Sequence, residues 1–441
     1  MSYEEPVDLL ITGSRLLTAK GLVRSSVAID GTKVVKIGKD ASMPRASEYL
    51  KLPSSSLLLP GVVDVHSHLR DMDLKHKGDF ASETQAAAAG GITFAVDMPN
   101  SRPPTLSAEA FEEKKRIASG RVAVDFGLNL GVYGNEDELS KVEENIAYGE
   151  IFVGPSTEGQ TVGYPELSRA LRIIARTGKP ACIHAEDPEL LLEVSEPYDH
   201  GASRPPEAEH RAVSRVLSLN ESIGARLHFC HISTSRALST IAQYKNRGMD
   251  VTCEVTPHHL ILGEDVTRDL GPLAKMNPPL RGAADVGSML EGTRSGTIDI
   301  IASDHAPHTL DEKSSGLGKA PSGVPGFETF IPSVLTYMME NSIDPVAFVR
   351  LANQGPARIF SIPQKGFGVG RDADLVVLDT KRRVVDPDSF LSKARYSPFQ
   401  GRKLKFWPVK TLLRGEIIFE DGDIIIKDRG HFICSGNQDG R

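Results

Sequence analysis

The sequence is poor in cysteine, which limits the kinds of site it can build. Four cysteines occur in 441 residues, at positions 182, 230, 253 and 434, and no two form a Cys-x-x-Cys pair. Most of them lie inside apolar runs, as buried reduced thiols do. We therefore expect no disulfide framework, and we interpret the cysteines as reduced core residues of a cytoplasmic protein.

Excess positive charge and long apolar segments are also missing. The chain carries 51 Lys and Arg against 58 Asp and Glu, a formal net charge of -7. Nucleic acids and anionic membrane surfaces demand basic patches, so neither is expected as a partner. No stretch reaches eighteen uninterrupted apolar residues, and the first residues lack both a basic and a long apolar region, so we expect neither a membrane span nor a signal peptide.

The chain is nevertheless 40% hydrophobic and long enough for a large core with a second, smaller unit. Both ends alternate short apolar runs with turn residues and show no helical period. These runs are residues 7–12, 22–29, 34–38 and 57–59 near the start, and 374–378, 409–414, 416–419 and 424–426 near the end. We expect residues 1–59 and 365–441 to build one β-sandwich domain together, since chain termini commonly lie close in space.

Between them, over residues 60–364, strand and helix patterns alternate. Leu167, Ala170, Leu171 and Ile174 follow the spacing of one helix face, between Pro165 and Gly178. Eight short apolar segments read as strands: 62–66, 92–98, 123–131, 150–154, 180–184, 226–231, 250–255 and 298–303. A doubly wound sheet would usually have fewer strands and a Gly-rich phosphate turn. The pattern therefore predicts an α/β fold of the (β/α)8 TIM-barrel type, with its chemistry at the carboxyl ends of the strands.

Metal-binding residue types stand at several of these strand ends. His66 and His68, two residues apart on one strand, point the same way. His184, His231 and Asp304 end the fifth, sixth and eighth candidate strands. Each alone is more simply a hydrogen-bonded polar residue, but one open face of a barrel would collect all five. Nitrogen and oxygen donors without thiolates suit Zn²⁺ or a similar divalent ion.

Five segments in this order resemble the cyclic amidohydrolases, in particular their dihydroorotase branch. They are residues 60–70, 97–104, 253–259, 275–281 and 303–308, and the likeness extends from about residue 7 to 420. The resemblance implies a metal-dependent hydrolase barrel flanked by a β-sandwich. It also implies the reversible conversion of N-carbamoyl-L-aspartate to L-dihydroorotate, a step of pyrimidine synthesis.

The residues fit that chemistry. A divalent ion can lower the pKa of bound water from about 15.7 to about 7, so that hydroxide attacks the ring amide, with Asp304 as general acid and base. Arg70 lies on the same strand face as His68 and offers a planar fork for a carboxylate. Asn100 and Asn277 can hold the ureide edge. From the resemblance, His68, His308 and the backbone at Ser322 and Gly323 join them as substrate contacts, although Asn-Pro pairs and a Gly/Pro-rich loop also occur as plain connectors.

The fourth strand departs from the family pattern. Many relatives carry a carboxylated lysine there that bridges two metals, whereas this chain has Glu150. Glutamate already holds a carboxylate on a shorter side chain, so we predict that Glu150 bridges the metals. Glu158 is the alternative bridging acid, and a third interpretation makes both acids solvated residues of a one-metal site.

Other activities compete with this interpretation. Allantoinase, hydantoinase and dihydropyrimidinase open related rings, but Arg70 argues against substrates that lack a carboxylate. A non-catalytic structural homologue would be expected to lose metal ligands, and all of them are present. The resemblance is compatible with a homo-oligomer and with association with aspartate carbamoyltransferase, and it decides neither.

Overall fold

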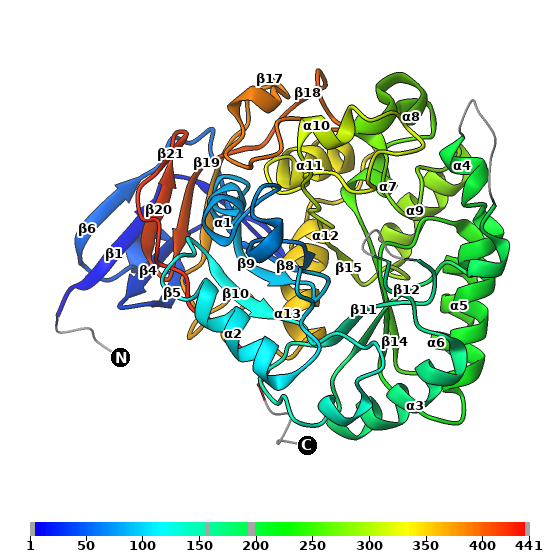
Figure 1. The fold of residues 1–441 in the computed structure, drawn as a ribbon. Helices are drawn as coiled ribbons and strands as arrows, with labels where there is room; N and C mark the ends of the chain where they lie inside the picture. Colours follow the sequence, from blue (N-terminus) through cyan, green and yellow to red (C-terminus); the bar gives the residue numbers. More distant parts are fainter. Residues whose placement is uncertain (1–4, 156–158, 193–198, 437–441) are drawn as a thin grey trace.

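The computed structural model describes residues 5–155, 159–192 and 199–436 (Figure 1). A barrel occupies one side of the molecule, and a pair of β-sheets built from strands near both ends of the chain occupies the other. Among the described residues, no helix is both long and apolar enough to cross a lipid bilayer.

Eight parallel strands form the barrel, as predicted. They pair in two arcs, β10-β9-β8 and β11-β12-β13-β14-β15. Single bridges close the ring, from Leu130 to Tyr148 on one side and from Ser67 to His305 on the other. The strands are β8 (Val62–Ser67), β9 (Ile92–Asp97), β10 (Asp125–Leu128), β11 (Tyr148–Phe152), β12 (Ala181–His184), β13 (Leu227–Phe229), β14 (Val251–Val255) and β15 (Ile300–Ile301). The (β/α)8 fold class is therefore confirmed.

Helices cover the outside of the barrel and shape its rim. In α3 (Tyr164–Ile174) the four predicted apolar residues are buried, and Gly178 ends the following turn with φ 69°. Only a residue without Cβ adopts that left-handed conformation freely, which is why the helical segment stops there. The other helices are α1 (Phe80–Ala89), α2 (Ala108–Ala118), α4 (His200–Ser203), α5 (Pro206–Asn220), α6 (Ser235–Asn246), α7 (Pro257–Ile261), α8 (Asp265–Leu270), α9 (Ala283–Ser295), α10 (Leu310–Lys313), α11 (Phe330–Glu340), α12 (Val346–Val349) and α13 (Gly355–Ile359).

Both chain ends contribute to the β-sandwich, again as predicted. A seven-stranded sheet runs β21-β20-β19-β16-β7-β2-β3, and a four-stranded sheet runs β5-β4-β1-β6. At the junction, Leu57–Pro60 of β7 pairs antiparallel with β16. The strands are β1 (Val7–Thr12), β2 (Arg15–Thr18), β3 (Gly21–Arg24), β4 (Ser26–Asp30), β5 (Lys33–Gly38), β6 (Ala46–Lys51), β7 (Leu57–Pro60), β16 (Leu375–Asp379), β19 (Trp407–Leu413), β20 (Glu416–Glu420) and β21 (Asp423–Ile424), with a separate pair β17 (Arg383–Val384) and β18 (Lys403–Leu404).

The structure refines the sandwich in three places. The apolar run at residues 22–29 is two strands in different sheets, β3 and β4, rather than one. Strands β2 and β6 were not anticipated. Residues 430–433 leave the sandwich and lie along barrel strand β10, where Phe126 donates its N–H to His431 O and accepts one from Ile433 N. We propose the boundaries 1–59, 60–364 and 365–441 for the two units, with this last stretch making its contacts on the barrel.

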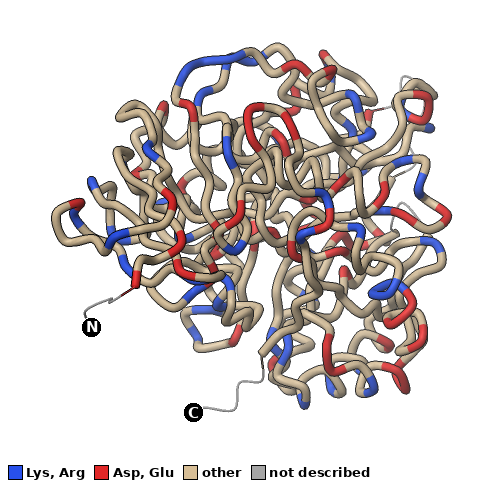
Figure 2. The backbone as a smooth tube through the Cα atoms, turned by 90° about the vertical axis from the view of Figure 1, so that its left-hand side faces the viewer, with Lys and Arg blue, Asp and Glu red and all other residues tan. Residues whose placement is uncertain are grey.

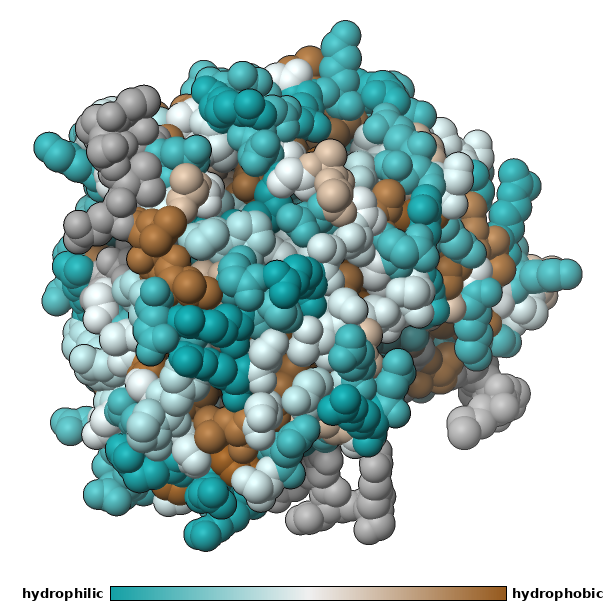
Figure 3. All heavy atoms as spheres, turned by 90° about the vertical axis from the view of Figure 1, so that its right-hand side faces the viewer, coloured by the Kyte–Doolittle hydropathy of each residue, from teal (hydrophilic) through white to brown (hydrophobic). Residues whose placement is uncertain are grey.

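Charged residues of both signs alternate along the described backbone (Figure 2). The barrel face in Figure 3 is largely hydrophilic, and its hydrophobic residues form separate small groups.

One buried ion cluster joins the barrel to the sandwich. The ammonium group of Lys365 lies 2.6 Å from Asp125 of β10, 2.7 Å from Asp374 and 3.3 Å from Asp372. Arg414 pairs with the other oxygen of Asp125. Burial lowers the pKa of Lys365, but the three carboxylates outweigh it and raise that pKa above its usual value. The ammonium group therefore stays charged and offsets three buried negative groups.

We expect Lys365→Met to lower the free energy of unfolding by about 3–5 kcal/mol, because it leaves buried carboxylates without their partner. Urea unfolding followed by circular dichroism measures the change. Lys33→Met is the matched control, since Lys33 contacts the same Asp372 at 2.6 Å but its side chain is 43% exposed. That control should cost less than about 1 kcal/mol, and equal losses in the two variants would contradict the role given to Lys365.

Candidate functional site

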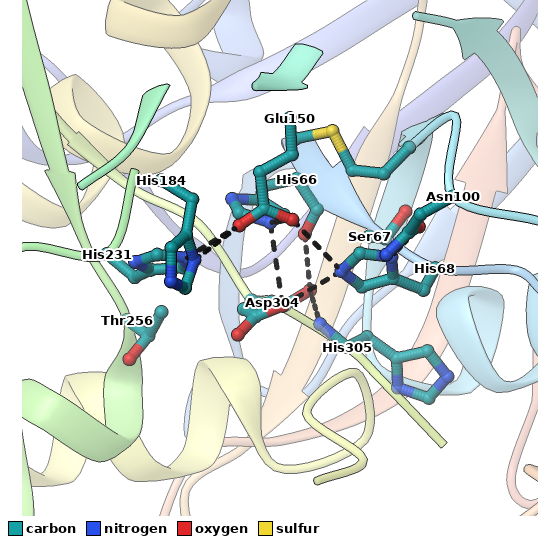
Figure 4. Close-up of polar contacts among 12 residues, drawn as sticks. His66, Ser67, His68, Asn100, Glu150, His184, His231, Thr256, Asp304 and His305 are labelled. Atoms are coloured by element: carbon teal, nitrogen blue, oxygen red, sulfur yellow. Dashed lines mark hydrogen bonds and ion pairs between the residues drawn. The ribbon is translucent and has the colours of Figure 1, made fainter. Parts of the chain in front are cut away.

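The predicted metal ligands converge at the carboxyl ends of the barrel strands (Figure 4). His66 lies in β8 with His68 just beyond it, Glu150 lies in β11, and His184 ends β12. His231 and Asp304 follow β13 and β15 within three residues. All six side chains are buried. The structure thus brings together residues that are up to 238 positions apart in the sequence (304 minus 66).

The carboxylate of Glu150 lies at the centre of this group. Its Oε1 is 2.8 Å from His231 Nε2 and 3.0 Å from His184 Nδ1. Its Oε2 faces the other pair, 3.7 Å from His66 Nε2 and 3.8 Å from His68 Nε2. Glu150 therefore belongs to two sets of three potential ligands, one with His66 and His68 and one with His184 and His231. This is the arrangement that a bridging carboxylate requires.

Gly149, the residue before Glu150, lets strand β11 lie close to strand β12. Gly149 has φ 122°, and a Cβ at this position would lie 2.4 Å from the carbonyl oxygen of Cys182 in β12. The pairing of β11 with β12 is irregular at the same point. A residue with a side chain would push the two strands apart. The close approach explains how a side chain as short as glutamate contacts both pairs of histidines. Glu158, the alternative bridging acid, lies outside the described residues.

Asp304 completes the group on the side of β8. Its Oδ1 is 3.2 Å from His68 Nε2 and 3.5 Å from His66 Nε2. Its backbone φ is 45°, and His231 and Arg70 are left-handed as well, at 32° and 63°. Such conformations cost about 1–3 kcal/mol each in residues other than glycine and cluster at functional sites. Three of the predicted site residues share this property.

Two carboxylates outside the group orient its histidines. Glu254 Oε1 lies 2.5 Å from His66 Nδ1, which directs the Nε2 atom of that ring toward Glu150 and Asp304. Glu186 Oε2 holds His184 Nε2 at 3.0 Å and is itself paired with Arg204 at 2.7 Å. Carboxylates that bind the far nitrogen of a ligating imidazole fix its tautomer and direction. Our sequence analysis missed both, although a glutamate inside the buried strand 250–255 was an available signal.

Electrostatics at the site favour a cation. Burial raises the pKa of the Glu150 carboxyl group, but its histidine partners hold it well below the usual value. Burial lowers the pKa of His184, yet Glu150 and Glu186 raise it to about 9. The carboxylates thus stabilise positive charge at this site. A bound metal ion would supply that charge in place of the protons on the histidines. His66 Nε2 is buried without a hydrogen-bond partner among the described residues. Four imidazoles and two carboxylates, with this orphaned nitrogen among them, fit a divalent ion.

A cavity opens directly onto this group. Six of the seven predicted substrate residues line it, including the predicted metal ligand His68, and so do Phe152 and Ala306. The complete lining is His68, Arg70, Asn100, Glu150, Phe152, His184, His231, Asn277, Asp304, Ala306, Ser322 and Gly323. One guanidinium group, two side-chain amides and five of the predicted metal ligands therefore face one cavity.

Three predicted substrate residues have protein partners that refine their roles. Asn100 Oδ1 accepts a hydrogen bond from His68 Nδ1 at 2.7 Å, so it also orients a predicted ligand. The N–H of Gly323 donates to Lys275 O, and its carbonyl accepts the hydroxyl of Tyr396. His308 lies behind Arg70, with Nε2 3.3 Å from Arg70 Nη2, and is not part of the cavity lining. Their contacts with substrate stay predictions.

Known proteins resemble this chain over nearly its whole length. The sequence model of the Amidohydrolase family matches residues 57–418. A dihydroorotase of Methanosarcina mazei is 38% identical over 446 residues, covering 97% of each chain. An L-hydantoinase of Paenarthrobacter aurescens is 34% identical over 455 residues, covering 98% of each. The solved L-hydantoinase (dihydropyrimidinase) from Arthrobacter aurescens superimposes with a TM-score of 0.92 at 32% identity, covering 97% of this chain and 100% of that one.

If Glu150 bridges two ions, Glu150→Gln should reduce the metal content from about two ions per chain to about one, because a neutral amide binds cations far more weakly than a carboxylate. Mass spectrometric metal analysis after dialysis measures this ratio. Glu143→Gln removes an exposed acid from the same part of the chain and should leave the content unchanged. Equal metal content in wild type and Glu150→Gln would remove Glu150 as the bridge.

Proposed function

The chain belongs to the amidohydrolase family, and from this premise we propose that it is a dihydroorotase. It would catalyse the reversible cyclisation of N-carbamoyl-L-aspartate to L-dihydroorotate in de novo pyrimidine (UMP) biosynthesis. That the protein is a hydrolase of cyclic amides follows from its family and its relatives. The finer assignment depends on one observation, which is that Arg70 lines the same cavity as the metal ligands.

Arg70 favours an acidic substrate over a neutral ring. Arg70 is only 5% exposed, and its Nε donates to the carbonyl oxygen of Pro307 at 3.1 Å. The guanidinium group lines the cavity, and its planar fork matches the two oxygens of a carboxylate. Dihydroorotate and carbamoyl aspartate carry such a carboxylate, whereas dihydrouracil and allantoin do not. This supports the dihydroorotase assignment over dihydropyrimidinase, hydantoinase or allantoinase, although an L-hydantoinase is also among the relatives.

We propose Zn²⁺ as the cofactor, one or two ions per chain, held by His66, His68, Glu150, His184, His231 and Asp304. When bound, such an ion lowers the pKa of water and polarises the amide carbonyl. A non-catalytic homologue is less well supported, because the six side chains that would hold the ion are all present and buried together.

Asp304 is the proposed general acid and base. Burial raises the pKa of its carboxyl group. The hydrogen bond from His68 and the positive charge of the neighbouring histidines lower that pKa by more than burial raises it, so the group is ionised at neutral pH. In hydrolysis it accepts the proton of the attacking water at a carboxylate oxygen. The new carbon–oxygen bond forms at the ring carbonyl, the carbon–nitrogen bond breaks, and Asp304 returns the proton to that nitrogen. In cyclisation Asp304 takes the proton from the ureido nitrogen as the carbon–nitrogen bond forms, and it returns that proton to the carboxyl oxygen that leaves as water, the reacting carboxyl group having taken its other proton from solvent.

Arg70 and the two asparagines would hold the substrate in place. Arg70 binds the ring carboxylate through its fork. The hydroxyl of Ser322 donates to Asn277 Oδ1 at 2.9 Å, which leaves the amide hydrogens of Asn277 to serve a substrate oxygen. We propose a cytoplasmic enzyme without nucleic-acid or membrane partners. A homo-oligomer and an association with aspartate carbamoyltransferase stay predictions.

The metal-loaded protein should turn over dihydroorotate and leave dihydrouracil, hydantoin and allantoin nearly untouched, because only the first offers Arg70 a carboxylate. A spectrophotometric assay with the four rings side by side measures this preference. Treatment with a chelator, followed by dialysis, should abolish turnover, and added Zn²⁺ should restore it. Turnover confined to the neutral rings would overturn the assignment.

Arg70→Met should lower kcat/KM for dihydroorotate by about 10- to 100-fold, the value of a hydrogen bond to a charged group. Arg70→Lys keeps the charge without the fork and should lie between Arg70→Met and the wild type. Any residual rate with dihydrouracil provides the internal comparison and should not fall. A parallel loss on both rings would mean that Arg70 supports the fold rather than the carboxylate.

A further inference from the structure

A second group of charged side chains lies behind Arg70, away from the metal ligands. Lys77 comes from the loop between β8 and α1, while His308 and Glu312 follow β15. Lys77 and His308 are 7% and 0% exposed. The ammonium group of Lys77 lies 3.2 Å from His308 Nδ1 and 3.1 Å from Glu312 Oε1. The proposed reaction uses neither Lys77 nor Glu312.

These contacts determine where the proton of His308 resides. An ammonium group has only hydrogens to offer, so Nδ1 must accept from Lys77 and therefore carries no proton. At the other end of the ring, Nε2 lies 3.0 Å from the carbonyl oxygen of Ser322, which can only accept. Burial lowers the pKa of His308 to about 3, so the ring is neutral and holds one proton. That proton is on Nε2.

The other tautomer satisfies fewer contacts. With the proton on Nδ1, the acceptor would be Glu312 Oε2 at 3.6 Å, which is too long for a hydrogen bond. The hydrogens of Lys77 would then oppose that N–H at 3.2 Å, and the lone pair of Nε2 would face that of Ser322 O. Its one gain is that Nε2 could accept from Arg70 Nη2 at 3.3 Å. Lys77 is thus the group that selects between the two states.

The selected tautomer continues into the substrate cavity. Through Nε2, His308 donates to Ser322 O and holds the backbone of that residue. The Ser322 hydroxyl in turn donates to Asn277 Oδ1 at 2.9 Å and so orients the side-chain amide. Ser322 and Asn277 line the cavity with Arg70. The position of the His308 proton, set by Lys77, therefore influences the direction of the Asn277 amide hydrogens, which we propose to bind substrate.

We propose that Lys77 is a positioning residue that holds His308 in its Nε2–H tautomer and, through Ser322, orients the amide of Asn277 toward the substrate. The tautomer follows from the contacts of His308 with Lys77 and with the carbonyl oxygen of Ser322, whatever the reaction is. The consequence for substrate binding rests on the proposed function.

Nitrogen-15 NMR of metal-loaded protein labelled at histidine reads the tautomer directly, because protonated and unprotonated ring nitrogens resonate far apart. The His308 signals are assigned by their loss in His308→Gln. We expect the Nε2–H form in the wild type and a shift to the Nδ1–H form, or a mixture, in Lys77→Met. Lys77→Arg keeps a donor-only cation and should retain the wild-type signals.

Glu312→Gln is the matched control. It removes the ion pair between Glu312 and Lys77 but leaves the Lys77 ammonium group donating to His308 Nδ1, so the tautomer should not change. Lys75→Met removes an exposed cation two residues away and should also have no effect. An Nδ1–H signal in the wild type, or an unaltered Nε2–H signal in folded Lys77→Met, would overturn the proposal. So would an equal change in Lys77→Met and Glu312→Gln.

Kinetics then test the link to substrate. Lys77→Met should raise KM for dihydroorotate about 5- to 10-fold, the value of roughly one hydrogen bond, with little change in kcat. Lys77→Arg should restore most of the loss. An unchanged KM together with a shifted tautomer would remove the link to Asn277. If the wild type fails to turn over dihydroorotate, the proposed function is wrong, while the NMR result still decides the role of Lys77.

Discussion

The sharing of one carboxylate between two pairs of histidines is the constraint on which the rest of the site depends. Glu150 contacts His184 and His231 through one oxygen and faces His66 and His68 through the other. This is possible because residues in or just beyond four barrel strands, β8, β11, β12 and β13, converge at one end of the barrel. The missing Cβ of Gly149 lets β11 lie close enough to β12 for a short side chain to serve. Strand packing therefore sets the geometry of the donors.

Around this centre, several residues act by holding other side chains in place. Glu254, Glu186 and Asn100 each bind the far nitrogen of a predicted ligand. Lys77 and His308 do the same work on the side of Arg70. In a buried site, hydrogen bonds of this kind restrict each ring to one direction, which reduces the rearrangement needed when charge develops on the reacting atoms. The left-handed backbone at Arg70, His231 and Asp304 indicates that the surrounding fold supports conformations that these residues would not adopt alone.

Sequence patterns predicted the barrel because each of its strands is a short, mostly apolar run between turn or helix signals. The same patterns missed β6, since Ala46–Lys51 is mostly polar and exposed and has no apolar run to detect. Five of the six predicted ligands could be proposed from strand ends, where topology brings them together, whereas Glu150, in the middle of β11, was proposed from the family resemblance. Glu254 was not predicted, because its contact with His66 spans 188 residues and depends on side-chain directions across the barrel. For the same reason the tautomer of His308 has no counterpart in the sequence.

The stretch at residues 430–433 has a consequence for how the chain is made. It hydrogen-bonds to Phe126 of β10, and the ring of Phe432 packs on those of Phe126 and Phe111. A nascent chain leaves the ribosome in order, so β10 emerges about three hundred residues before the segment that covers its edge. Until that segment is made, this edge of β10 lacks its partner. Unpaired strand edges of this kind are sites for chaperone binding or incorrect pairing. Strand β10 therefore gains this neighbour only after the segment at residues 430–433 has been made.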